Sequence, residues 1–90
     1  MTDLSTLVFP TIHMNGTSKK DLYDGYLSAY TALSAAKNAL RATAPHQRDY
    51  YVSPDPEAGR QADLQFVSRM RRLNDVFEEI ETILVYLQDR

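Results

Sequence analysis

The side chains best suited to hold an anion gather in the middle of the chain, in residues 45–55, a segment that lacks a helical pattern. Arginine forks hold phosphate through paired hydrogen bonds, and tyrosine rings stack on nucleobases. The candidate binding residues in and beside this segment are His46, Arg48, Tyr50, Tyr51, Arg41 and Arg60. A solvated loop, in which the two tyrosines close the end of a helical pair, explains the same residues without a ligand.

A second candidate anion site lies where the first helical pattern begins. Backbone N–H groups at a helix start attract negative charge, and lysines follow directly. The residues of this candidate site are Asn15, Gly16, Thr17, Ser18 and Lys19. The spacing of a P-loop is absent, and helix capping alone also explains these residues.

Catalytic and metal-binding patterns are not indicated. No serine, histidine and carboxylate follow one another at a spacing that suggests a nucleophile with its base. Cysteine is absent, and His13 and His46 are far apart in the sequence. We therefore expect no enzyme activity, no cofactor and no metal.

The composition is that of one small domain spanning residues 1–90. A formal charge of −2 gives no sign of nucleic-acid binding by net electrostatics. No apolar run approaches the roughly 20 residues that span a bilayer, and the first residues lack a signal-peptide pattern. We expect a soluble cytoplasmic chain without a membrane segment.

A long helix is predicted over residues 17–44, where Ser18 and Asp21 form a capping pattern and Pro45 sets the end. Apolar residues recur at spacings of four and three, so they share one face. This stripe consists of Leu22, Tyr26, Ala29, Leu33, Ala36 and Leu40.

A second helix is predicted over residues 56–89, with an apolar stripe that continues to Leu87. Its cap is either Ser53 or Asp55, because each precedes a proline, which is well tolerated at the first helical position. Residues 1–16 predict an extended arm, since proline interrupts their apolar run. The arm ends in a predicted turn at Asn15-Gly16, two residues that tolerate positive φ.

These elements predict an all-α fold, an antiparallel two-helix hairpin with an extended N-terminal arm. Matching the helices outward from the central segment places Leu22 near Ile80. Leu84 and Leu87 then project beyond the start of the first helix, where we expect Phe9, Ile12 and Met14 of the arm to cover them.

The helices carry more apolar surface than one hairpin buries, which predicts a homo-oligomer such as a C2 four-helix bundle. The candidate interface residues are Tyr23, Leu27, Tyr30, Val76, Ile83 and Tyr86. The charges are also segregated along the hairpin. Basic residues lie toward the central segment and include Arg69, Arg71 and Arg72, whereas Glu78, Glu79 and Glu81 form an acidic patch that reads as a solvated face.

The arm, first helix and central segment together resemble a group of small accessory proteins of phages and prophages. The likeness rests on residues 9–18, on an alanine-rich helix ending at Ala44-Pro45, and on Arg48-Asp49-Tyr50-Tyr51. The resemblance implies a phage context, and with it the cytoplasm of a host cell. Such proteins are commonly inhibitors of host factors, sponges for signalling nucleotides, or assembly components.

We therefore expect a non-enzymatic binding module that blocks or sequesters a host component through protein–protein contacts. One alternative is a sponge that binds an anionic nucleotide signal at subunit interfaces. The other is a structural or assembly component of a virion.

Overall fold

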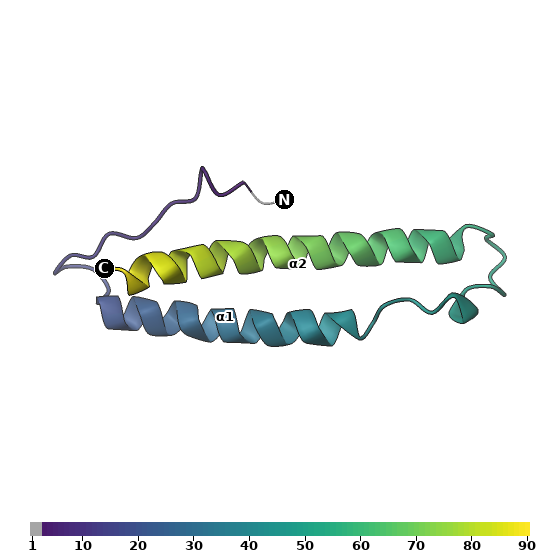
Figure 1. Cartoon of the computed structure of the whole chain (residues 1–90), viewed down its shortest axis with the longest axis horizontal. Helices are drawn as coiled ribbons and strands as arrows, with labels where there is room; N and C mark the ends of the chain where they lie inside the picture. Colours follow the sequence, from purple (N-terminus) through teal and green to yellow (C-terminus); the bar gives the residue numbers. More distant parts are fainter. Residues whose placement is uncertain (1–2) are drawn as a thin grey trace.

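The structure is a computed structural model that describes residues 3–90; residues 1 and 2 of the predicted arm lie outside the described residues. Two long helices, α1 (Lys19–Arg41) and α2 (Ala58–Gln88), pack side by side as an antiparallel hairpin, and the loop between them contains the short 3-10 helix η1 (Gln47–Asp49) (Figure 1). The molecule is elongated, with extents of 61 × 24 × 19 Å. The predicted all-α hairpin is confirmed, and residues 3–90 contain no strand.

The α1 helix begins where its sequence predicts. The Ser18 hydroxyl accepts a hydrogen bond from the backbone N–H of Asp21 at 3.1 Å, which satisfies one of the free donors of the first turn. The helix ends at Arg41, three residues before the predicted boundary. The N–H groups of Ala42 and Thr43 bond three residues back instead of four, because the chain already tightens ahead of Pro45.

The α2 helix begins at Ala58, two residues after the predicted start, and neither predicted cap residue caps it. The Ser53 hydroxyl accepts from the N–H of Asp55 at 3.2 Å, and a carboxylate oxygen of Asp55 accepts from the N–H of Glu57 at 2.9 Å. Each polar side chain therefore stabilises a turn by bonding to the backbone two residues ahead. Such a local bond competes with helix capping, and the helix begins only after these turns.

The predicted stripe of α1 is half-buried except at Ala36, and the face toward α2 also includes two residues outside the stripe. Ala36 is exposed, whereas Tyr30 and Lys37 are half-buried. Phe77 of α2 lies against both: its ring is 4.9 Å from the ring of Tyr30, and the Lys37 ammonium lies 4.0 Å from its centroid. A lysine stem packs well along apolar surface, so the sequence pattern of apolar residues alone missed Lys37.

The open ends of the two helices are level, which corrects the predicted overhang of Leu84 and Leu87. The Lys19 ammonium donates to the backbone carbonyl of Arg90 at 2.7 Å, joining the start of α1 to the residues just after α2. The extra length of α2 lies at the other end, where the loop runs beside its first turns (Figure 1). The predicted proximity of Leu22 and Ile80 is confirmed, since both line one surface hollow.

Gln47 fixes the loop to α2. Its side-chain amide donates to the carbonyl of Gly59 at 3.2 Å and to a carboxylate oxygen of Asp63 at 3.0 Å. Gly59 is buried, and a Cβ there would collide with the Gln47 amide. Glycine at this position therefore permits a close approach, which offsets its low helix propensity.

We expect Gln47→Ala to lower the free energy of unfolding by about 1 kcal/mol, because two hydrogen bonds are lost. In that background Gly59→Ala should raise stability by up to about 1 kcal/mol, since alanine favours the helix and nothing is left to collide with it. In the wild type the same substitution should gain less. Chemical denaturation of the four proteins measures this coupling, and equal effects of Gly59→Ala in both backgrounds would contradict it.

The arm lies along the second half of α2 (Figure 1), and it is extended apart from a turn in which the N–H of Leu7 bonds to the carbonyl of Leu4 at 3.2 Å. The ring of Phe9 stacks on the ring of Tyr86 at 4.6 Å, as expected for an arm that covers this end. The expectation is wrong for Met14, which is 95% exposed. The buried apolar core of the described residues lies at the same end and consists of Ile83, Leu84 and Leu87.

The arm ends in a turn, as predicted, in which the N–H of Gly16 bonds to the carbonyl of His13 at 3.1 Å. The predicted reason is wrong, because no residue among 3–90 has positive φ. A Cβ on Gly16 would lie 2.7 Å from Nε2 of His13. A side chain at position 16 would collide with the imidazole ring, so glycine is favoured there.

Neither α1 nor α2 contains an apolar stretch of the length needed to span a membrane.

Candidate functional site at the open end of the hairpin

A surface hollow lies at the open end, where α1 begins and α2 ends. It has a volume of about 500 Å³ and is lined by Lys19, Lys20, Tyr23 and Gln88. The first three residues lie within the first five positions of α1, where residues three and four apart share a face. Gln88 joins them from the last position of α2, because the helix ends are level. We call this the open-end hollow.

Two lysine side chains line the open-end hollow, whose surface is otherwise mostly apolar. The Lys20 ammonium pairs with the Asp24 carboxylate at 2.6 Å, and the Lys19 ammonium bonds to the carbonyl of Arg90. The hydrogen bond with Asp24, followed by the charge of that carboxylate, raises the pKa of Lys20 above its ordinary value of 10.5. An ammonium has three donors, and each of these bonds uses one, so both groups can still donate to a ligand. No carboxylate lines the hollow.

Of the five residues of the predicted anion site at the start of α1, one lines the open-end hollow. Lys19 lines the open-end hollow, whereas the hydroxyl of Ser18 is already used to cap the helix. Asn15, Gly16 and Thr17 are exposed and lie just before it. From the sequence, Tyr23 is expected at an oligomer interface and Gln88 has no predicted role. Tyr23 could have been found from its spacing to the lysines, but Gln88 depends on the register of the hairpin.

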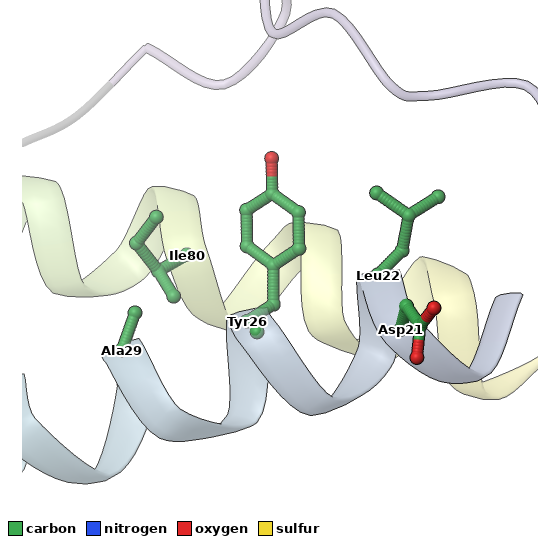
Figure 2. Close-up of a pocket in the computed structure, with 6 residues that line it drawn as sticks. Asp21, Leu22, Tyr26, Ala29 and Ile80 are labelled. Carbon is green, nitrogen blue, oxygen red and sulfur yellow. The ribbon is translucent and has the colours of Figure 1, made fainter. Parts of the chain in front are cut away.

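The second hollow, of about 260 Å³, lies between the helices and is mostly apolar. Figure 2 shows Leu22 and Tyr26 projecting from α1 on one side, and Ala29 next to Ile80 of α2. Asp21 is its one charged lining residue. The open-end hollow is also mostly apolar, but this one has no cationic lining residue, so it suits an apolar group better than an anion.

The central segment does not form a gathered binding site. Arg41 donates to Asn38 and Arg60 to Glu57, so each guanidinium is tied to a neighbour in sequence. His46 and Arg48 are exposed. Among residues 3–90 no cation lies over the ring of Tyr50 or Tyr51. Tyr51 is 79% exposed, so it does not close the end of the helical pair, while Tyr50 is half-buried.

Three of the six residues of the predicted oligomer interface pack against other residues of the same chain. Ile83 is only 7% exposed, Tyr30 packs on Phe77, and Tyr86 is stacked between Phe9 and the guanidinium of Arg90. Ile83 is thus buried within the chain, whereas Tyr30 and Tyr86 are half-buried, and their place in an oligomer interface stays a prediction. Leu27 and Val76 remain 40% and 47% exposed, and Tyr23 lines the open-end hollow.

Within residues 3–90 no group of three or more histidine, cysteine or acidic side chains could hold a metal ion. Comparison with family models, curated proteins and solved structures gives no match. The function is therefore proposed from the geometry of the open-end hollow alone.

Proposed function

We propose that this chain is a non-enzymatic binding module that sequesters an anionic nucleotide and acts as a homo-oligomer. The observation that carries the proposal is the open-end hollow, which is lined by Lys19, Lys20 and Tyr23 and by no acidic residue. Its volume of about 500 Å³ falls within the range of about 300–1,000 Å³ typical of small-molecule sites.

Each part of a nucleotide has a suitable partner in this hollow. Lys19 and Lys20 attract phosphate oxygens, and the ring of Tyr23 offers a surface on which a base stacks. The amide of Gln88 both donates and accepts, which suits the edge of a base. The hollow is open to solvent on one side. A second subunit over that side would enclose the ligand, in keeping with a site at a subunit interface.

Sequestration requires no reaction, and the residues around the hollow fit that role. None of the four is paired with a general base in the way that activates a nucleophile. In a phage context, removing a signalling nucleotide from solution would block a host response without any turnover.

A thermal-shift screen with linear and cyclic mono- and dinucleotides tests the proposal. At 100 times its dissociation constant, a ligand should stabilise the protein by about 2.7 kcal/mol. Tyr23→Ala and Lys20→Gln should each remove most of this shift, whereas Tyr23→Phe should keep it because the stacking surface remains. Tyr51→Ala and Arg48→Ala serve as matched controls in the central segment and should bind like the wild type.

The opposite pattern would contradict the open-end site. If Arg48→Ala and Tyr51→Ala abolish the shift while Tyr23→Ala keeps it, the nucleotide binds at the central segment. If no nucleotide raises the melting temperature of the wild type, the proposal that the protein sequesters a nucleotide is wrong.

A second candidate function is capture of a host protein at the loop end of the hairpin. Tyr51 and Val52 are 79% and 77% exposed there, and such side chains are typical centres of protein interfaces. Val52→Asp should then abolish capture of one defined protein from a host lysate without changing the nucleotide response. Equal capture by Val52→Asp and wild type would exclude this surface.

A further inference from the structure

A second apolar stripe runs along the side of α2 that neither α1 nor the arm covers. Leu64, Val67 and Val85 are 51%, 58% and 49% exposed. Val67 and Val85 are 18 residues apart, which is about five turns of 3.6 residues, and Leu64 lies one turn before Val67. The three side chains therefore share one side of a helix about 46 Å long, and we call this side the outer stripe.

Opposite charges separate the two apolar ends of the outer stripe. Arg71 lies four residues after Val67, and Glu78 lies two turns further along on the same side. Glu81 lies four residues before Val85. The ion pairs of residues 3–90 are Lys20–Asp24 and Arg60–Glu57, so neither Arg71 nor the two glutamates has a charged partner among those residues. Glu78 accepts only a hydrogen bond from Asn74 at 3.2 Å.

The order along the outer stripe is thus apolar, basic, acidic, apolar. Its centre lies at the height of Asp75, which is turned about 80° from the line of Val67 and Val85, so the central residue on the stripe is the uncharged Asn74. A copy of this helix laid antiparallel reverses the order and brings each group to its complement. A parallel copy would place like charges together, which is unfavourable in a helix pair.

We infer that a second copy of this chain packs antiparallel on the outer stripe of α2, with the two-fold axis at the height of Asp75. Leu64 and Val67 then lie opposite Val85 of the second copy. Arg71 lies opposite Glu78 and Glu81 of the second copy, and the two-fold axis repeats every contact. The apolar ends supply buried area, and the two charge clusters fix direction and register.

The arm leaves this surface free. Phe9 stacks on Tyr86, and one residue turns a helix by about 100°, so the side chain of Val85 points away from that contact. The outer stripe therefore differs from the interface predicted from the sequence, since none of its residues belongs to that interface. It gives the proposed homo-oligomer a specific surface.

Charge reversal tests this pairing by mass in solution, measured with light scattering on size-exclusion chromatography at about 100 µM. Arg71→Glu should lower the mass of the wild-type assembly by a factor of at least two, and so should the variant Glu78→Arg/Glu81→Arg. An equimolar mixture of the two variants should regain the wild-type mass, because each places its reversed charges against the other's. Arg48→Glu, which makes the same change in net charge within the loop, should keep the wild-type mass.

A wild-type chain that stays monomeric at this concentration would overturn the inference. So would an Arg71→Glu variant with the wild-type mass, or a mixture that does not reassemble while both variants keep the helical circular dichroism of the wild type. The measurement uses no ligand, so its failure is distinguishable from failure of the proposed nucleotide site.

Discussion

Leu87→Ala is expected to lower the free energy of unfolding by about 2–5 kcal/mol. Leu87 has 0% exposure and is the most completely buried large side chain among the described residues. Truncation removes apolar contacts and leaves a cavity between α2, α1 and the arm. Chemical denaturation followed by circular dichroism measures the loss.

Leu27→Ala is the matched control on α1. Leu27 is 40% exposed, so the same truncation should cost no more than about 1 kcal/mol. Equal losses for the two variants would show that the open end of the hairpin is not the core of the fold.

Phe77→Ala is expected to cost about 3 kcal/mol, the low end of the range for truncating an aromatic core residue, because Phe77 is half-buried. Its ring holds the middle of the hairpin together by contacting Tyr30 and Lys37 at the same time. Phe77→Leu keeps most of the volume and removes only the ring interactions, so about 1–2 kcal/mol should be lost.

Lys37→Met distinguishes the contribution of the Lys37 ammonium from that of the Tyr30 ring, the two groups that contact Phe77. Methionine keeps the apolar stem and removes the charge, so the change isolates the interaction of the ammonium with the ring, worth roughly 0.5–2 kcal/mol. If Lys37→Met costs nothing in the wild type, or costs the same in a Phe77→Leu background, the ammonium does not stabilise the hairpin through Phe77.

The fold could be predicted from the sequence because its signals are local. The repeat of apolar residues marks both helices, Ser18 caps the first, and Pro45 prevents its continuation. The register could be predicted only in part, since the proximity of Leu22 and Ile80 is confirmed but the level open ends were not expected. It depends on Gln47 packing on Gly59, twelve residues away, which holds a long loop against α2 in place of a tight connection.

The candidate site was predicted less well than the fold. Arginines and tyrosines that are close in sequence, such as Arg48 and Tyr51, do not gather when the loop exposes them separately. Lys20 and Gln88 gather at the open-end hollow although they are distant in sequence, because the hairpin closes there. The self-complementary order of charges on α2 was visible in the sequence, but its meaning required the structure to show which side of the helix stays uncovered.

Calorimetric titration of the protein with the nucleotide that gives the largest thermal shift tests the central claim most directly. The account predicts saturable binding to the wild type, loss of that binding in Tyr23→Ala, and recovery of the nucleotide chemically unchanged after the protein is denatured. Binding that persists in Tyr23→Ala, or recovery of a converted product, would contradict a sequestering site at the open end of the hairpin.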